Sequence, residues 1–467
     1  MKKHVDFLHK KIHFIGISGA GMIALVQYLR SFGRCKLSGS DLKISKAVKE
    51  LEMQGVEIFK GHDSSNINNV DIIVYSRAIP DDNCELKMAK KKRKKCFSRG
   101  EFLAILMHTY ARKCVVAGTH GKTTTTGLLV HILDIAGVTP SFMIGGELPP
   151  YFINGRYSES STFVSESDES DGSFLHLDPD VAIITNIEQE HMNFYKTQKK
   201  LLEAFEKFSM ICEKNKGVLI VNKDNHHCLD LANKINAKTL CFFSLKDKKA
   251  EFNAQNIVFN MDHFTFDLYH NQKKLGALTV KLLGMHNVYN VLGCVSMCIK
   301  MGVSFEKIAE GLTRFQGVKR RMQLINTTNN IKVFDDYGHH PTEVKATLEG
   351  LRKAQKGRLT CVFQPHRYSR VQEHLIDFFD AFNRADQLLL TPIYSANEKI
   401  KDKHLLEKMR QGIQENTKNE VIVFKKQSDI VAYLADSLKD GEIVITMGAG
   451  DIFKVSHKLA KVYNEKK

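Results

Sequence analysis

The chain has 467 residues, of which 43% are hydrophobic and 26% are charged, and its formal net charge at pH 7 is +16. This length predicts about three domains, and the composition excludes a disordered chain, a low-complexity or collagen-like protein and a small domain held together by disulfides. The excess of Lys and Arg is compatible with nucleic acid, an anionic membrane or a phosphate-rich substrate, so charge alone does not identify a partner.

The cysteines and the N-terminus indicate the compartment. The ten cysteines include no CxxC pair and no zinc-finger spacing with histidine, so we expect reduced thiols. The first apolar run is interrupted at Gly16 and leads into a glycine-rich turn instead of a signal-peptide cleavage site. No apolar stretch is long enough to span a bilayer. The sequence therefore predicts a cytoplasmic protein without a membrane partner.

The first third alternates short apolar runs with segments of helical period, which predicts βαβ units on a parallel sheet. Strands are expected at 12–17, 71–75 and 96–98, and helices at 22–32, 82–90 and 101–108. A fresh strand begins after Arg112, so residues 1–112 are predicted to form the first domain.

The strongest basic run is the block 90–95, with the sequence KKKRKK. A solvated helix end is the favoured interpretation, and a binding patch for an anionic partner is the alternative. No helix-turn-helix, RNA-recognition or zinc-finger signature accompanies the block. We therefore expect no nucleic-acid partner.

The second block, residues 113–320, continues the α/β alternation and then changes character. Strands are expected at 113–117, 162–164, 181–184 and 218–221, with a helix at 123–136. Between residues 251 and 283, apolar and polar residues alternate around polar turn residues at 271–274, which predicts added antiparallel hairpins.

Residues 321–467 are predicted to form a third α/β domain. Its strands are expected at 331–334, 360–363, 387–390 and 443–446, and its helices at 343–354 and 371–382.

The first glycine-rich turn, Gly16-Ile-Ser-Gly19-Ala-Gly21, lies between a predicted strand and helix. Such a turn lets backbone amides approach a pyrophosphate at a helix N-terminus, and Asp41, about twenty positions on, can bind a ribose hydroxyl. The order GxxGxG differs from the GxGxxG of NAD- and FAD-binding proteins. The turn therefore favours a nucleotide that carries a diphosphate, with a purely structural turn as the alternative.

The second turn reads Gly118-Thr-His-Gly121-Lys122-Thr123-Thr124 and also joins a predicted strand to a helix. Its amides can cradle phosphates, Lys122 can reach a transferring phosphoryl group, and the Thr123 hydroxyl can bind Mg²⁺. Val116 occupies the position of the first glycine in GxxxxGK[ST], so the match is incomplete. We nevertheless predict a phosphate loop. The predicted fold class is α/β with a Rossmann-like N-terminal domain, a central P-loop ATPase-like domain with added antiparallel hairpins, and a Rossmann-like C-terminal domain.

Candidate metal ligands follow two strands of the central domain. Glu166 and Glu169 come just after the run 162–164, and His191 follows the run 181–184. Because the carboxyl ends of parallel strands share one edge of the sheet, these groups are expected to converge on the phosphate loop. An acidic surface loop and a structural histidine are the alternatives.

Eight motifs distributed in order along nearly the whole chain resemble those of the Mur ligase family. They are GTHGKTTTT, ESDESDGSF, TNIEQEHM, HNVYN, FQGVKRR, DDYGHHPTE, QPHRYSR and MGAGD. His120 and the acidic segment from Asp168 to Phe174 most resemble the branch that adds L-alanine to UDP-N-acetylmuramate. The nearest alternative within the family is a ligase that recycles murein tripeptide. Where the family pattern has alanine after the tyrosine of DDYGHHPTE, this chain has Gly338.

The resemblance implies a role for each matching residue. The UDP part of the substrate would be held by Gly16, Ser18, Gly19, Ala20, Gly21, Met22 and Asp41. ATP would be bound by Gly118, Thr119, His120, Gly121, Lys122, Thr123 and Thr124, with Asn287 and Asn290 at the adenine. Mg²⁺ would be held by Thr123, Glu166 and His191. The substrate carboxylate and the amino acid would meet Tyr337, His339, His340, His366, Arg367 and Arg370. Catalytic roles would fall to Lys122, His191, His340 and Arg367.

The implied reaction is ATP-dependent joining of L-alanine to the lactyl carboxylate of UDP-N-acetylmuramate through an acyl phosphate, in peptidoglycan biosynthesis. It would use Mg²⁺ as cofactor and release ADP and phosphate. A P-loop ATPase that moves a partner protein is an alternative outside the family. The motifs specify no oligomeric state.

Overall fold

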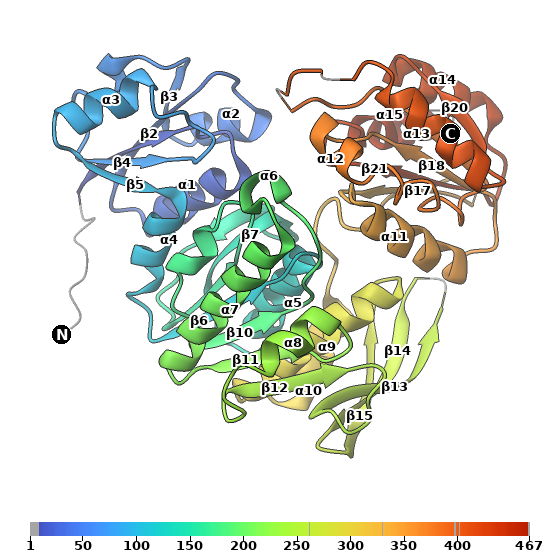
Figure 1. The fold of residues 1–467 in the computed structure, drawn as a ribbon, viewed down its shortest axis with the longest axis horizontal. Helices are drawn as coiled ribbons and strands as arrows, with labels where there is room; N and C mark the ends of the chain where they lie inside the picture. The colour runs from blue at the N-terminus through green and yellow to red at the C-terminus, as the bar shows by residue number, and fades with distance from the viewer. Residues whose placement is uncertain (1–8, 261, 329, 397, 401, 466–467) are drawn as a thin grey trace. The chain divides into compact units, whose positions relative to one another are not determined.

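The computed structural model describes residues 9–465 apart from 261, 329, 397 and 401 (Figure 1). Its strands form three sheets, of 5, 10 and 6 strands, that succeed one another along the chain. The predicted α/β class is confirmed. No helix in the described part of the chain is long and apolar enough to cross a membrane.

The first sheet is parallel, with the strand order β3-β2-β1-β4-β5. The order in which successive strands are added reverses between β1 and β4, and open α/β sheets bind ligands at such a point, beyond the carboxyl ends of the strands. The strands are β1 Lys11–Ile15, β2 Lys36–Asp41, β3 Glu57–Lys60, β4 Ile72–Tyr75 and β5 Lys95–Ser98. The helices are α1 Ala20–Phe32, α2 Lys46–Met53, the 3-10 helix η1 Ser64–Ile67, α3 Cys84–Lys91 and α4 Arg99–Met107.

The central sheet has the order β15-β14-β13-β12-β11-β10-β6-β9-β7-β8. The strands are β6 Arg112–Ala117, β7 Ser141–Leu148, β8 Ile153–Arg156, β9 Thr162–Glu166, β10 Val181–Ile184, β11 Val218–Asn222, β12 Leu240–Ser244, β13 Phe252–Phe259, β14 Phe264–His270 and β15 Lys273–Val280. The helices are α5 Lys122–Ile135, η2 Ser173–His176, α6 Met192–Tyr195, α7 Gln198–Lys214, α8 His226–Ala232, α9 Met285–Lys300 and α10 Phe305–Arg314.

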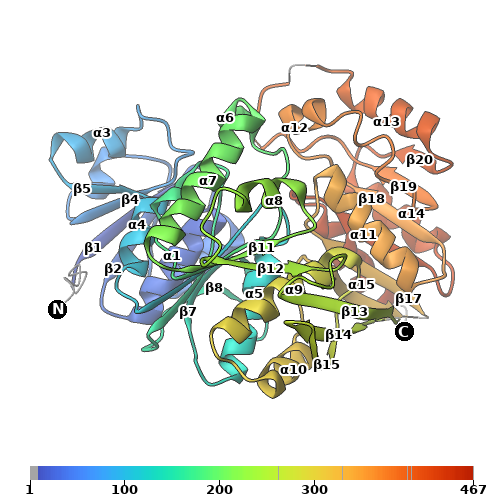
Figure 2. The same ribbon diagram turned by 60° about the horizontal axis from the view of Figure 1, so that its bottom comes forward.

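Strand β6 lies in the interior of the central sheet, parallel to β10 and β9. The connection through α5 runs from β6 toward β7, whereas the connection through α7 runs from β10 toward β11 in the opposite direction. Because such crossovers are right-handed, α5 and α7 lie on opposite faces of the sheet, α5 with α10 and α7 with α8 (Figure 2). The phosphate-loop sequence therefore joins a buried strand to a buried helix.

The predicted hairpins are present at β13, β14 and β15. Only Asn271 and Gln272 connect β14 to β15, and a two-residue connection requires antiparallel strands. Both residues have positive φ, 48° and 65°, as a type I′ turn requires.

The third sheet has the order β16-β17-β21-β18-β19-β20, in which only the β16–β17 pair is antiparallel. The strands are β16 Gln323–Thr328, β17 Ile331–Asp336, β18 Leu359–Phe363, β19 Gln387–Leu390, β20 Glu420–Val423 and β21 Ile443–Met447. The helices are α11 Pro341–Ala354, α12 Tyr368–Glu373, α13 Leu405–Asn416, α14 Gln427–Ser437 and α15 Phe453–Glu465.

The helix predicted at 371–382 is wrong beyond Glu373, where α12 ends. The following residues form consecutive tight turns, in which Phe379 N bonds Ile376 O and Ala381 N bonds Phe378 O. These turns, in which an amide bonds the carbonyl three residues earlier, still bury Phe378 and Phe382. An apolar spacing typical of a helix therefore arises here without an α-helix.

The block 90–95 spans the end of α3, a turn and the start of β5. The structure confirms that the run ends a helix. Its side chains make local contacts: the Lys90 Nζ lies 3.5 Å from Asp81 Oδ1, and the Lys92 Nζ donates to Asn68 Oδ1 at 2.9 Å. These contacts support the interpretation of the block as a solvated helix end.

The chain divides into two compact units. The first comprises the described residues up to Asn256 together with Phe266–Thr279 and Tyr289–Gln316. The second comprises the described residues of Ile257–Thr265, Val280–Val288 and those from Gly317 onward. The division into three domains at 112 and 320 stays a prediction.

Within the first unit, one hydrophobic cluster continues from the first sheet into the central sheet. Helix α1 packs on β7 and β8, and the buried Tyr28 and Tyr110 hydroxyls are 2.7 Å apart. The α1 side chains also bond the backbone of β8. The Gln27 Oε1 accepts from the amides of Asn154 at 2.6 Å and Gly155 at 3.2 Å. Helix α1, which follows the first strand, is thus hydrogen-bonded to β8, the outermost strand of the central sheet.

Candidate functional site

The first glycine turn lies between β1 and α1 and is held by the end of β2. The Ser40 carbonyl accepts from Gly16 N at 2.9 Å, and the Asp41 carboxylate accepts from Ser18 N at 3.0 Å and from Lys43 N at 3.1 Å. The Asp41 side chain therefore holds the glycine turn in place by accepting hydrogen bonds from nearby backbone amides. Gly19, Ala20, Gly21 and Met22 form the N-cap and first turn of α1.

The helices that follow the two glycine turns have open N-termini. Gly19 caps α1 and Gly121 caps α5, and neither helix receives a hydrogen bond from a capping side chain. By contrast, the Ser98 hydroxyl caps α4 and the Thr197 hydroxyl caps α7. Open amides at a helix N-terminus carry partial positive charge and attract anions.

Lys122 folds back over the phosphate loop. Its Nζ donates to the carbonyls of Gly118 at 2.6 Å and Thr119 at 2.9 Å, and to Glu169 Oε1 at 2.9 Å. Burial would lower the pKa of Lys122, but the Glu169 carboxylate outweighs burial and raises it. The ammonium therefore stays charged at the N-terminus of α5.

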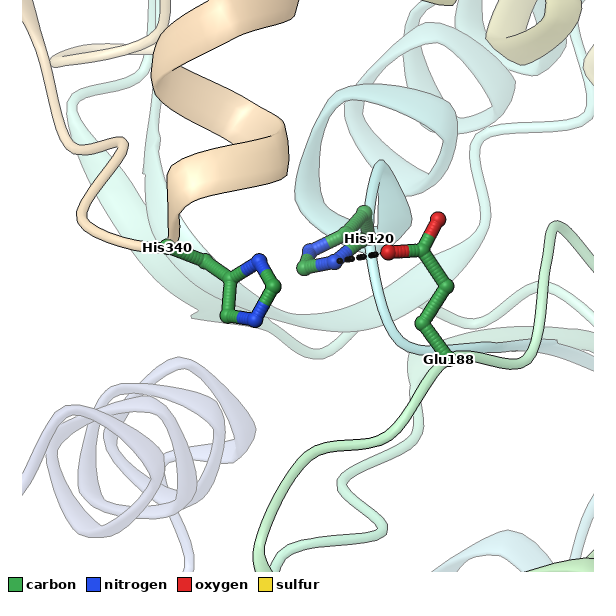
Figure 3. Close-up of side chains that lie close together, drawn as sticks. All are labelled: His120, Glu188 and His340. Carbon is green, nitrogen blue, oxygen red and sulfur yellow. Dashed lines mark ion pairs between the residues drawn. The ribbon is translucent and has the colours of Figure 1, made fainter. Parts of the chain in front are cut away.

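The residues after β10 form hydrogen bonds with the backbone of the phosphate loop. The Thr185 hydroxyl and the Asn186 Nδ2 donate to His120 O at 2.6 and 3.1 Å, and the Asn186 Oδ1 accepts from His120 N at 2.9 Å. The His120 Nε2 lies 3.3 Å from Glu188 Oε2 (Figure 3). The motif that contains His191 thus also shapes the loop, through Asn186, a role that the motif alone did not reveal.

Glu166 and Glu169 have different surroundings. The Thr123 hydroxyl donates to Glu166 Oε1 at 2.9 Å, and Gly145 N donates to Glu166 Oε2 at 2.6 Å. Glu169 lies between Lys122 and the His191 Nε2, which is 3.5 Å from Glu169 Oε1. Among the described residues, no group of three metal-binding side chains includes Glu166 or His191. Thr123 and Glu166 offer adjacent oxygens, which fit a hard divalent cation completed by phosphate and water oxygens.

The two asparagines on α9 have separate surroundings. Asn290 lies beside the phosphate loop, where a Cβ on Gly121 would overlap its Oδ1, and Gly121 has a φ of 82°. This close approach and the positive φ both require glycine. The Asn287 Nδ2 donates to Leu283 O at 2.8 Å within its own helical turn.

In the second unit, predicted residues gather where β17 and β18 end. The His339 Nδ1 lies 3.0 Å from Tyr337 O, and the His339 and His366 ring centroids are 5.7 Å apart. The Arg370 Nη1 lies 3.3 Å from His366 Nδ1. The Arg320 guanidinium lies over the Tyr337 ring at 4.9 Å. The cluster is therefore cationic and aromatic, which suits a carboxylate ligand.

His366 carries its proton on Nε2. The guanidinium of Arg370 can only donate, so the His366 Nδ1 accepts. Burial lowers the pKa of His366 to about 3, with further contributions from the nearby His339 and arginines. The ring also stacks on Tyr394, at 5.4 Å between centroids and 9° between planes. A neutral imidazole that donates from Nε2 can orient an acceptor but is a weak base.

We expect His366 to remain neutral from about pH 8 down to about pH 5, because a pKa lowered to about 3 places its protonation below this range. Nuclear magnetic resonance of labelled histidine side chains would follow the ring. Arg370→Gln should raise the pKa by removing a cation. A His366 transition near pH 6.5 in the unmodified protein would contradict the assignment.

His340 and Arg367 occupy helix starts. The buried His340 is the N-cap of α11, and its Nδ1 accepts from Thr342 N at 3.3 Å. Arg367 is the N-cap of α12, has a φ of 69° and donates its amide to Tyr394 O at 2.8 Å. Such strained backbone is found at functional sites and supports a role for the Arg367 position.

Sequence patterns missed several residues of this cluster. Arg320 lies in the quoted FQGVKRR motif, and its Nη2 donates to Gly448 O at 2.6 Å. The buried Asp336 carboxylate accepts from the amides of Gly338 at 2.6 Å and Met322 at 2.7 Å, and burial raises its pKa to about 6. Tyr394 follows β19 in a loop without a recognisable motif. Asp336 is the second residue of the DDYGHHPTE motif, and this position could have identified it from the sequence.

Models of known protein families match successive parts of the chain. Three family models match in order: "Mur ligase family, catalytic domain" at residues 11–111, "Mur ligase middle domain" at 116–298 and "Mur ligase, glutamate ligase domain" at 320–450. The chain is 39% identical over 452 residues to the UDP-N-acetylmuramate--L-alanine ligase of Clostridium novyi, covering 96% of each chain. It is 38% identical over 455 residues to the enzyme of the same name from Dictyoglomus turgidum, again covering 96% of each.

Solved structures agree. The crystal structure of UDP-N-acetylmuramate-alanine ligase from Thermotoga maritima has a TM-score of 0.84 and 25% identity, covering 98% of this chain and 100% of that one. A murein peptide ligase from Psychrobacter arcticus has a TM-score of 0.69 and 25% identity, covering 97% and 98%. With relatives this similar along almost their entire length, the chain belongs to the Mur ligase family.

Proposed function

We propose that this chain joins L-alanine to the lactyl carboxylate of UDP-N-acetylmuramate at the expense of ATP, giving UDP-N-acetylmuramoyl-L-alanine, ADP and phosphate in peptidoglycan biosynthesis. The observation that carries the proposal is the pair of open helix N-termini in the first unit, one at each glycine turn, with Lys122 at the second. One suits the diphosphate of UDP and the other the phosphates of ATP. The ten free cysteines support a reducing cytoplasm as the site of the reaction.

The chemistry requires an activated carboxylate, because the leaving group from a free carboxylate would be oxide. Transfer of the terminal phosphoryl group of ATP to the lactyl carboxylate gives an acyl phosphate, whose leaving group is phosphate. Lys122 turns from Glu169 and the loop carbonyls toward the phosphates and stabilises their charge. Thr123 and Glu166 would hold Mg²⁺, which would supply positive charge to the phosphates.

The neutral amine of L-alanine then attacks the acyl phosphate through a tetrahedral intermediate. Arg370 and Arg320 supply positive charge for carboxylates in the second unit, and the His366 Nε2–H donates a hydrogen bond. A His366 pKa of about 3 makes this ring a poor acceptor for the amine proton. His366 is therefore disfavoured as the base that takes this proton.

Phosphate release with UDP-N-acetylmuramate, ATP and Mg²⁺, with each amino acid added singly, tests the proposal. L-alanine should give the highest kcat/KM. Selective stimulation by the tripeptide L-alanyl-γ-D-glutamyl-meso-diaminopimelate would instead identify a recycling ligase. ATP hydrolysis that needs neither the UDP substrate nor an amino acid would identify a P-loop ATPase.

We expect Glu166→Ala to raise the Mg²⁺ concentration needed for half-maximal activity by about 10-fold or more, because it removes an oxygen ligand beside Thr123. His191→Ala should act in the same direction. Glu169→Ala tests the other carboxylate, which contacts Lys122 and His191. If only Glu169→Ala changed the Mg²⁺ requirement, Glu166 would be the wrong carboxylate.

Neutralising the block 90–95 with glutamine should leave kcat and the KM for UDP-N-acetylmuramate within about twofold, because surface substitutions away from a site have small effects. The assay should be run at low and at high salt. A large rise in KM that is strongest at low salt would show that the block attracts the anionic substrate.

A further inference from the structure

Arg99 lies between the first glycine turn and the acidic segment that follows β9. It is the first residue of α4, directly after the N-cap Ser98 at the end of β5. Its Nη2 lies 3.3 Å from Asp168 Oδ2, 3.8 Å from Asp171 Oδ2 and 3.0 Å from Ser173 Oγ. These partners belong to the acidic segment after β9, which also supplies Glu169 to Lys122.

The other side of the Arg99 side chain covers the first turn of α1. A Cβ on Gly21 would lie 2.9 Å from the Arg99 Cδ and 3.1 Å from its Nη1. The guanidinium thus lies against the backbone of the open helix N-terminus, and a side chain at position 21 would require Arg99 to shift. One cation therefore borders both the glycine turn and the acidic segment.

The ion pair between Arg99 and Asp168 is partly exposed to water. The Arg99 side chain is 18% exposed and that of Asp168 is 45% exposed, so water reaches the pair. Ion pairs open to water contribute little to stability, so an incoming dianion can replace Asp168 as the partner of Arg99.

We propose that Arg99 binds the diphosphate of the UDP substrate and that Asp168 competes with the substrate for Arg99. This inference rests on the proposed function, because the glycine turn is the diphosphate site. The planar guanidinium, already adjacent to the amides of α1, donates to phosphate oxygens from the side opposite the helix. Substrate binding then releases Asp168 from Arg99.

The test measures binding of UDP alone, without ATP or Mg²⁺, by titration calorimetry. Arg99→Met, which keeps an unbranched apolar stem but removes the guanidinium, should weaken UDP binding by about 10-fold or more, since hydrogen bonds between charged groups are stronger than those between neutral groups. Arg99→Lys should recover part of the affinity. Asp168→Asn should strengthen binding, because it removes the competitor. Arg30→Met makes the same charge change in the last turn of α1 and should leave UDP affinity unchanged.

The opposite effects of the Arg99 and Asp168 variants separate binding from a structural role. If the Arg99–Asp168 pair only holds the two loops together, Arg99→Met and Asp168→Asn weaken UDP binding to the same extent, and the proposal is overturned. Unchanged affinity in Arg99→Met also overturns it. If the unmodified protein binds ATP but not UDP, the proposed function itself fails. Thermal unfolding of each variant shows whether the fold is retained.

Discussion

Replacing Lys122 with alanine is expected to lower kcat by about 1,000-fold, because the change removes the cation that the phosphate loop directs at the transferring phosphoryl group. The buried Glu169 would then lose the ammonium that lies 2.9 Å from it. An uncompensated buried charge costs stability, so Lys122→Ala alone should also lower the melting temperature. Steady-state phosphate release and thermal unfolding measure the two effects separately.

A double variant distinguishes catalysis from stability. Lys122→Ala with Glu169→Gln removes both charges, so the melting temperature should recover while kcat stays low. Lys223→Ala is the matched control, because it removes another lysine of the first unit from a carboxylate, Asp247, at 2.6 Å. Turnover near that of the unmodified protein in Lys122→Ala would refute the assignment of the phosphate loop.

Glu85→Gln is expected to destabilise the first unit by about 3 kcal/mol at pH 7. The buried Glu85 carboxylate accepts from the Ser40 hydroxyl at 2.6 Å and lies 2.7 Å from the His62 Nδ1 and 3.4 Å from the His13 Nε2. Burial alone would raise the pKa of Glu85, but hydrogen bonds from these partners and Asn66 outweigh it and lower the pKa to about 2.

The pH dependence follows from the direction of that shift. A carboxyl whose pKa is lower in the folded state stabilises the fold above about pH 4.5, and the stabilisation is lost as the pH falls toward 2. Urea unfolding followed by circular dichroism should therefore show a difference between Glu85→Gln and the unmodified protein that shrinks to about 1 kcal/mol at pH 3. Glu206→Gln, in an exposed pair with Lys234, is the control. A difference that is the same at both pH values would contradict this account.

The sequence was most informative where function depends on backbone geometry. The two glycine turns were predicted because glycine at a strand–helix junction has a local physical cause, and the structure places both at open N-termini. The strands and helices around them were predicted for the same reason, since periodicity is local. The prediction at 371–382 failed because consecutive tight turns bury Phe378 and Phe382 at helical spacing.

Contacts between distant segments could not be predicted. Glu85 is a single acidic residue on α3, and its partners come from β1, from β2 and from the loop after β3. Arg99 begins a helix with an ordinary capping box, and nothing in that pattern indicates that its side chain reaches Asp168. The continuous core of the first unit likewise depends on how α1 packs against β7 and β8.

The contact between α1 and β8 also protects the protein from self-association. Strand β8 is at the edge of the central sheet, and free edge amides invite a strand of another molecule to pair. Gln27 occupies the amides of Asn154 and Gly155, and the Ser31 hydroxyl occupies that of Tyr157 at 2.7 Å. If α1 were not docked, these edge amides would be free to pair with another strand, so docking of α1 removes an edge at which the chain could aggregate.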